Sequence, residues 1–402
     1  MLLVYAIAVT ACTAGTAPRT YAPSPAINGT RTPAEVSSTV NSGTKTPVLA
    51  TETAAAFFSG LPACSNPDVP ALAAMELAFV ADWDGDWEVY KIRADGSQLT
   101  QLTDNSTADS DPVWSPDGAQ IAFELDVFHP RLYVVQADGS GDSSIGPDFD
   151  AFSPAWSPLG DQIAFLDFDD QDIDDLFVVN AATGDVRRIT EGTDVKPGAP
   201  NFSPDGSLLA FTGGVPGREP GHGLFTINPD GTGLKEVGLP HEVIYSFMWH
   251  PFNNEIVYDA WSREEAGFYL ATLEGTVTRL PIAPDSRGSS PEWSPDGSLI
   301  GYIADAPRLD SSGALINRAS LHVATPDGQT DVALLEPPRD QSTPFLISNF
   351  AWAPDGRYVA YAVGARGSSQ ADLYVLDVCD GTSTLVVEAI RASSPPSWRP
   401  LP

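Results

Sequence analysis

The 402-residue chain carries 53 acidic residues against 21 basic ones, a formal net charge of −32 at pH 7. Such a surface repels nucleic-acid phosphates and anionic lipid headgroups, which argues against DNA, RNA and a bare membrane surface as partners. A hydrophobic content of 42% is enough for a core, while 34 Gly and 36 Pro favour many short strands joined by turns.

The chain begins with an apolar run, MLLVYAIAVTAC, that ends at Cys12. The run is too short to span a bilayer as a helix, so it predicts a signal peptide over residues 1–12. Its last four residues resemble a bacterial lipobox, which implies that Cys12 is acylated and anchors the exported protein in the cell envelope or at the cell surface. Because no Lys or Arg precedes Arg19, an ordinary secretion signal cleaved near Ala14 or Ala17 stays open.

Residues 13–63 are dense in Thr, Ser, Ala, Pro and Gly and hold few large apolar side chains. Such a segment cannot bury enough surface to offset the entropy of ordering, so it predicts a disordered tether. The remaining residues, 64–402, are expected to form the folded domain.

One short phrase recurs through that domain. WSPDGAQIAF begins at Trp114, and close copies follow at intervals of 42 to 59 residues. The aromatic residues that open the copies are Trp114, Trp156, Phe202, Trp249, Trp293, Trp352 and Trp398. Because one aromatic residue stands at the same place in every copy, we interpret the set as packing between repeats rather than as a sugar-stacking site.

Each repeat continues with a β-rich stretch that ends in a turn, often Asp-Gly, and then a short last strand. Four strands in roughly 45 residues are typical of one propeller blade. The repeat predicts an all-β, seven-bladed β-propeller of four-stranded antiparallel blades, with six blades as the alternative. The ring should close where residues 395–400 pair with residues 77–80, and an insertion near 307–319 should form a long loop.

The copies of WSPDGxxIAF, together with ADWDGDWEVYKIRADG at residues 81–96, resemble the TolB-type, WD40-like β-propeller repeat family. The resemblance covers residues 71–402 and implies the propeller fold. It says little about function, because the same repeat occurs in periplasmic scaffolds, peptidase accessory domains and sugar-active enzymes.

Motifs for hydrolysis are missing from the sequence. There is no Gly-x-Ser-x-Gly elbow, which argues against a serine peptidase. The five histidines show no HExxH spacing. His129, His222 and His241 fall in loops expected on one face, where a metal site is conceivable, although scattered loop histidines are the favoured interpretation.

Two acidic stretches, residues 82–88 and 167–175, could supply oxygen ligands to calcium from a loop. The first is an ordinary turn of the repeat. The second is richer in acid, although a solvated acidic loop is the favoured interpretation. Its calcium candidates are Asp167, Asp169, Asp170, Asp172 and Asp174. No other cofactor is expected.

A propeller gathers its longer loops on one face, which we call the long-loop face. These loops join the fourth strand of a blade to the first strand of the next, and the second strand to the third. Tryptophan and arginine are common binding anchors. The candidates on this face are Trp83, Arg218, Trp261, Arg263 and Arg308.

With Cys12 assigned to lipid, Cys64 and Cys379 remain as a pair in an oxidising compartment. Cys64 precedes the closing blade and Cys379 ends the third strand of the blade before it, so we predict a disulfide, with two unrelated thiols as the alternative.

These observations favour a monomeric, non-catalytic, surface-tethered propeller that binds a protein, a peptide or a glycan. The alternative is an extracellular lyase or glycosidase whose site lies in the central depression. A purely structural component of the cell envelope is the third interpretation.

Overall fold

The computed structural model describes residues 64, 70–126, 129–146, 150–168, 174–217, 222–238, 243–261, 266–282, 287–309, 315–336, 346–365 and 367–401. All of them belong to one compact unit, residues 33–402. The predicted signal peptide, Cys12 and the predicted tether lie outside the described residues. Among the described residues, no helix is long and apolar enough to cross a membrane.

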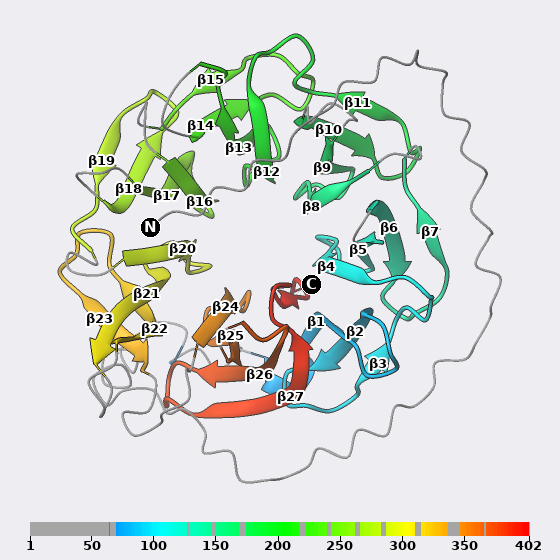
Figure 1. Ribbon diagram of the computed structural model, residues 1–402, viewed down its shortest axis with the longest axis vertical. Coiled ribbons are helices and arrows are strands. Elements are labelled where there is room, and N and C mark those ends of the chain that lie inside the picture. The colour runs from blue at the N-terminus through cyan, green and yellow to red at the C-terminus, as the bar shows by residue number, and fades with distance from the viewer. Residues whose placement is uncertain are drawn as a thin grey trace, which may run out of the picture. The chain divides into compact units, whose positions relative to one another are not determined.

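The strands form seven four-stranded antiparallel blades arranged in a ring (Figure 1). A short 3-10 helix, η1 (Leu72–Ala74), precedes them. Blade 1 holds β4 (Asp109–Trp114), β5 (Gln120–Leu125), β6 (Arg131–Gln136) and β7 (Asp142–Ser144); blade 2 holds β8 (Phe152–Trp156), β9 (Gln162–Phe168), β10 (Asp174–Asn180) and β11 (Val186–Arg188); blade 3 holds β12 (Lys196–Phe202), β13 (Leu209–Gly214), β14 (His222–Ile227) and β15 (Lys235–Glu236). Blade 4 holds β16 (Val243–Trp249), β17 (Glu255–Trp261), β18 (Ala266–Thr272) and β19 (Val277–Arg279); blade 5 holds β20 (Arg287–Trp293), β21 (Ile300–Leu309), β22 (Leu315–Ala324) and β23 (Asp331–Leu335). Blade 6 holds β24 (Leu346–Trp352), β25 (Tyr358–Gly364), β26 (Gln370–Asp377) and β27 (Ser383–Arg391); blade 7 holds β28 (Ser397–Trp398), β1 (Glu76–Ala81), β2 (Glu88–Arg93) and β3 (Thr100–Gln101).

Blade 7 is built from both ends of the described chain. β28 pairs with β1 through Leu77 opposite Trp398 and Ala78 opposite Ser397. This pairing confirms the predicted closure and the seven-bladed ring. One further pairing, Ala81 opposite Ile390, joins β1 to β27, so that blades 6 and 7 form one continuous sheet.

The recurring aromatic residue ends the innermost strand of every blade. All seven are buried, with 4 to 9% of each residue exposed. Three of the indoles donate a hydrogen bond to a carbonyl of the preceding blade: Trp156 to Val113, Trp249 to Asn201, and Trp398 to Ala351. Each of these acceptors directly precedes the aromatic residue of its own blade, so the motif links neighbouring blades in register.

The remaining letters of the motif build the turn and the second strand. In blade 1, Ser115 donates to Asp117 at 2.6 Å and accepts the amide of Gln120 at 2.9 Å. Gly118 takes φ of 65°, which a glycine adopts without strain. The aromatic residue of the second strand stacks on one from the third, as Phe165 does on Phe177 with ring centroids 5.7 Å apart. The motif therefore specifies a packed blade.

The insertion in blade 5 is not the long loop that the sequence predicts. β21 and β22 run on together as a hairpin, and their pairing extends to Leu309 opposite Leu315. The extra residues continue an existing strand pair, because antiparallel strands of equal length can lengthen without disturbing the rest of a blade. The insertion adds no further blade, as expected.

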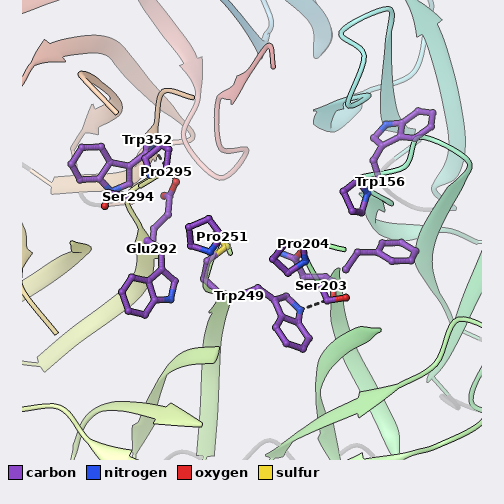
Figure 2. Close-up of a pocket in the computed structure, with 14 residues that line it drawn as sticks. Trp156, Ser203, Pro204, Trp249, Pro251, Glu292, Ser294, Pro295 and Trp352 are labelled. Carbon is purple, nitrogen blue, oxygen red and sulfur yellow. Dashed lines mark hydrogen bonds between the residues drawn. The ribbon is translucent and has the colours of Figure 1, made fainter. Parts of the chain in front are cut away.

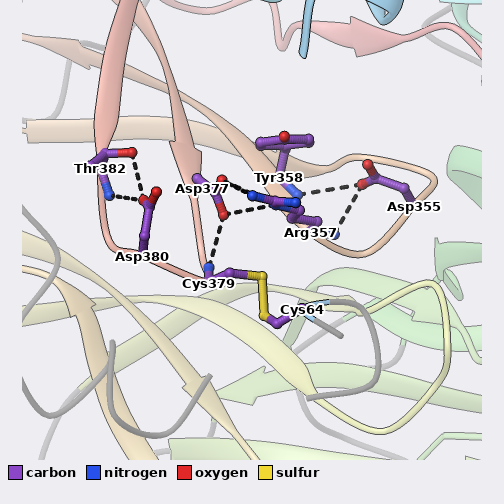
Figure 3. Close-up of a disulfide and its surroundings, with 8 residues drawn as sticks. All are labelled: Cys64, Asp355, Arg357, Tyr358, Asp377, Cys379, Asp380 and Thr382. Atoms are coloured by element: carbon purple, nitrogen blue, oxygen red, sulfur yellow. Dashed lines mark hydrogen bonds and ion pairs between the residues drawn. A yellow bond between two sulfur atoms is a disulfide. The ribbon is translucent and has the colours of Figure 1, made fainter. Parts of the chain in front are cut away.

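A disulfide joins Cys64 to Cys379, with their Cα atoms 5.4 Å apart (Figure 3). Cys379 follows β26, and its amide donates to Asp377 at 2.9 Å. Asp377 also binds Arg357 at 2.7 Å, which fixes the turn on the blade. The bridge thus connects the segment that leads into blade 7 with the outer part of blade 6.

Candidate functional site

Each complete innermost strand carries one irregularity close to the long-loop face. The register of β4, β8, β12, β16, β20 and β24 against its second strand shifts once, in every case before the aromatic residue. At three of these shifts a non-glycine residue takes a positive φ: Asp111 (48°), Ser153 (53°) and Ser290 (54°). Such bulges leave backbone groups that need partners outside the strand ladder.

Glu124 on β5 supplies one such partner. Its carboxylate accepts the backbone amide of Ser153 in blade 2 at 2.6 Å and the hydroxyl of Ser110 at 3.1 Å. Only 7% of the residue is exposed. Burial raises the pKa of Glu124 to about 7, and the nearby charge of Asp111 adds to the rise. This side chain therefore ties blade 1 to the bulge of blade 2.

A second buried pair, Glu88 and Asp109, lies between blades 7 and 1. Both residues are fully buried. Glu88 accepts the amide of Asn105 at 2.7 Å, and Asp109 accepts the hydroxyl of Thr103 at 2.6 Å. Burial raises the pKa of Glu88 to about 7 and that of Asp109 well above its usual range. The loop after β3 is fixed by these bonds.

Blade 4 repeats the arrangement with Asp259. This carboxylate accepts the amide of Ser246 at 2.6 Å and its hydroxyl at 2.9 Å, and the same hydroxyl accepts the amide of Ser290 in blade 5 at 3.1 Å. Burial raises the pKa of Asp259. Buried carboxyl groups thus hold the bulges and join adjacent blades at several points of the ring.

The five predicted anchors of the long-loop face are only partly described. Trp83 is half-buried and packs on its own blade, with its ring centroid 4.7 Å from that of Tyr90. Trp261 and Arg308 lie on strands β17 and β21. Arg218 and Arg263 lie outside the described residues. The convergence of these side chains on one ligand stays a prediction.

The acidic stretch at 167–175 begins and ends in strands rather than lying wholly in a loop. Asp167 lies on β9 and Asp174 on β10, and the pairing of Asp174 with Phe168 continues the ladder. The expectation of one loop was wrong at both ends, because the hairpin lengthens as it does in blade 5. The other three candidates, Asp169, Asp170 and Asp172, lie outside the described residues.

The histidines are also dispersed. His129 is exposed and lies 3.6 Å from Asp150, His222 is on β14, and His241 lies outside the described residues. In the described part of the chain, no group of three or more His, Cys, Asp or Glu side chains comes together in a way that could hold a metal ion.

A hollow of about 330 Å³ opens at the other end of the ring, where the innermost strands end (Figure 2). Aromatic and proline side chains dominate its wall. The lining residues are Trp156, Pro158, Asn201, Phe202, Ser203, Pro204, Met248, Trp249, Pro251, Glu292, Trp293, Ser294, Pro295 and Trp352. The wall is built by blades 2 to 6, and it suits an apolar group better than a highly charged one.

Among the described residues that line this wall, Glu292 is the one ionisable side chain. Its carboxylate accepts the backbone amide of Trp352 at 2.9 Å, across the boundary between blades 5 and 6. Burial raises the pKa of Glu292 to about 8, although the bond from Trp352 opposes the rise. The sequence does not predict this hollow, because the lining residues belong to the recurring phrase or directly precede it, and the aromatic ones among them are interpreted as packing between repeats.

Comparison with known proteins points to one repeat family. Residues 147–344 match the family model described as the TolB beta propeller domain. A "Protein TolB homolog" of Chlorobium luteolum is 31% identical over 139 residues, which cover 34% of this chain and 30% of that protein. The "Tol-Pal system protein TolB" of Alcanivorax borkumensis is 34% identical over 125 residues, which cover 28% of this chain and 29% of that protein. The matched stretch spans less than a third of the length of these curated relatives.

Solved structures share the fold at low sequence identity. An oligogalacturonate lyase from Vibrio parahaemolyticus superposes with a TM-score of 0.58 at 16% identity, covering 75% of this chain and 86% of that one. A prolyl endopeptidase superposes with a TM-score of 0.57 at 14% identity, covering 84% of this chain and 52% of that one. These likenesses show the propeller fold alone.

Proposed function

This chain belongs to the TolB-type β-propeller repeat family, and from that premise we propose that it is a non-catalytic binding scaffold of the cell envelope. In this proposal the chain is exported, is anchored through Cys12, and binds a protein, a peptide or a glycan on the long-loop face. The tether over residues 13–63 would hold that face away from the membrane.

One observation supports the non-catalytic part of the proposal. The buried carboxyl groups beside the long-loop face accept hydrogen bonds from the strand bulges and loops of the propeller. A glycosidase needs two carboxyl groups that flank an open substrate site. Glu88 and Asp109 are neighbours, but both are fully buried and bound by Asn105 and Thr103. Glu124 is bound by the bulge of the next blade.

A carbohydrate-active enzyme is the second candidate. The observation that favours it is the raised pKa of Glu124, since a carboxyl group that titrates near 7 suits a general acid. For this function, Glu124 would have to release Ser153 and reach the substrate. A lyase or glycosidase of this kind would be inactivated by Glu124→Gln.

Binding and turnover can be measured on the same purified chain. A glycan array and a pull-down from cell-envelope extract would identify the ligand, and mass spectrometry of the retained ligand would show whether it has been cleaved. We expect retention without cleavage. Arg308→Ala and Trp261→Ala should reduce retention, whereas the control Arg187→Ala, on the outer strand β11, should not. The proposal would be contradicted if the retained ligand were cleaved. It would also be contradicted if Arg308→Ala and Trp261→Ala retained as much ligand as the unmodified chain.

A further inference from the structure

The short turns at the end of the innermost strands form the second face of the ring, which we call the turn face. In four described turns an aspartate stands three residues after the recurring aromatic residue. These are Asp117, Asp205, Asp296 and Asp355. The same position holds Leu159 in blade 2 and Phe252 in blade 4, with 69% and 73% of the residue exposed.

The fold gains nothing evident from these two exposed apolar side chains. In blade 3, Asp205 accepts the hydroxyl of Ser203 at 2.6 Å and the amide of Ser207 at 3.0 Å, which closes the turn. Leu159 and Phe252 cannot accept such bonds through their side chains. A single exposed apolar residue is common on protein surfaces, whereas apolar side chains gathered around a hollow mark an interaction surface.

Leu159 and Phe252 belong to the blades on either side of blade 3, and each directly follows a proline that lines the hollow, Pro158 and Pro251 respectively. Leu159 reaches the neighbouring turn, since a Cβ atom on Gly206 would lie 3.2 Å from its Cγ. The ring of Phe252 meets that of His250 with centroids 6.2 Å apart, and His250 meets Trp293 at 4.7 Å. Phe252 is thus linked through the ring of His250 to Trp293, which lines the hollow, and it directly follows Pro251, another lining residue that Figure 2 labels.

The charges around this surface are negative. Hydrogen bonds from Ser203 and Ser207 lower the pKa of Asp205, and bonds from Ser294 and Ser298 outweigh burial in lowering that of Asp296. Both carboxylates are thus ionised at neutral pH. Glu292 inside the hollow adds no charge at neutral pH, because burial raises its pKa to about 8. A second copy of this chain, with net charge −32, would meet electrostatic repulsion here.

We propose that the turn face of blades 2 to 5 is a docking surface for a protein segment that carries large apolar side chains next to lysine or arginine. The apolar side chains cover Leu159 and Phe252 and enter the hollow between Trp249 and Trp293. The basic side chains lie against Asp205 and Asp296. This surface is separate from the long-loop face and does not depend on what binds there.

Synthetic peptides test the proposal directly. The probe is acetyl-KLKFKL-amide, with acetyl-ELEFEL-amide and acetyl-KSKSKS-amide as comparisons, and binding to the full chain is followed by calorimetry and tryptophan fluorescence. Leu159→Asp and Phe252→Asp restore the residue that the other turns carry, so they should fold normally. Each should weaken binding of the first peptide by about tenfold or more, because burial of one such side chain contributes at least that factor.

Leu401→Asp is the matched control, since it makes the same change at an apolar residue that is 39% exposed in blade 7. It should leave the affinity unchanged, and the acidic and serine peptides should bind at least about tenfold more weakly than the first. The proposal fails if no peptide binds, if all three bind alike, or if Leu159→Asp and Phe252→Asp bind as the unmodified chain does. Concentration-dependent dimerisation that Phe252→Asp abolishes would instead identify a second copy as the occupant. Ligand capture on the long-loop face should be unaffected by these variants, so the two proposals fail separately.

Discussion

Glu124→Gln should stabilise the propeller at alkaline pH and lose that advantage as the pH falls. Glutamine can keep both bonds of Glu124, because its carbonyl accepts the amide of Ser153 and its amide donates to Ser110. What the substitution removes is a buried carboxyl group whose pKa rises from 4.5 to about 7 on folding.

The direction of the pH dependence follows from whether the folded or the unfolded chain binds the proton of Glu124 more tightly. Between pH 4.5 and 7 the folded chain holds the proton on Glu124 while the unfolded chain releases it, so stability falls as pH rises through this window. At 1.36 kcal/mol for each pKa unit, the full penalty is about 3 kcal/mol, present above pH 7. Glutamine does not titrate and carries no such penalty.

Urea unfolding of both proteins, followed by tryptophan fluorescence, gives the difference in unfolding free energy. We expect Glu124→Gln to be more stable by about 3 kcal/mol at pH 8.5 and by about 1 kcal/mol at pH 5.5. Asp205→Asn is the control, because the pKa of Asp205 is lowered and its titration lies below this range. A difference for Glu124→Gln that is constant with pH, or that grows toward acid, would refute the assignment of Glu124 as a buried frame residue.

Four further predictions concern the ends of the chain, the closing strand and calcium. Replacing Cys64 and Cys379 together with serine should lower the unfolding free energy by at most about 6 kcal/mol, the chain-entropy value for a loop of this length, and non-reducing peptide mapping of the native protein should show no free thiol at either position. Trp398→Ala should lower the unfolding free energy by about 3–5 kcal/mol, because the buried indole and its hydrogen bond to Ala351 hold the closing strand in place. A thermal unfolding midpoint within error of that of the unmodified chain would argue against closure by β28. Cys12→Ala should move the protein from the membrane fraction to the soluble fraction, whereas unchanged fractionation would remove the lipid anchor from the account. Calcium should leave the thermal unfolding midpoint unchanged relative to a chelator, since Asp167 and Asp174 lie on paired strands rather than together in one loop, and a clear rise would instead support a calcium site at 167–175.

The fold could be predicted from the repeat because each residue position of the motif has the same structural role in successive blades. Trp114 and its counterparts fill the boundary between blades, Asp117 and Gly118 make the turn, and residues 121–123 form the buried second strand. Even the closure through Trp398 followed from counting copies. Local patterns of this kind can be recognised in a single sequence.

Other features depend on contacts between distant residues, which the spacing of residues along the sequence does not reveal. The hairpins of blades 2 and 5 lengthen because their strands continue to pair, and the residues involved carry turn-like or acidic side chains that suggest a loop. Glu124 bonds a residue 29 positions away in the next blade. Leu159 and Phe252 were visible as departures from Asp-Gly, and their exposure beside the hollow needed the ring to be assembled.

The central claim is that the propeller binds a ligand on its long-loop face without converting it. The most direct measurement is to incubate the purified chain with the ligand captured from cell-envelope extract and to follow both bound and released ligand by mass spectrometry. The account predicts ligand of unchanged mass, with binding reduced by Arg308→Ala and kept in Glu124→Gln. Release of cleaved ligand that stops in Glu124→Gln would contradict it and would identify an enzyme.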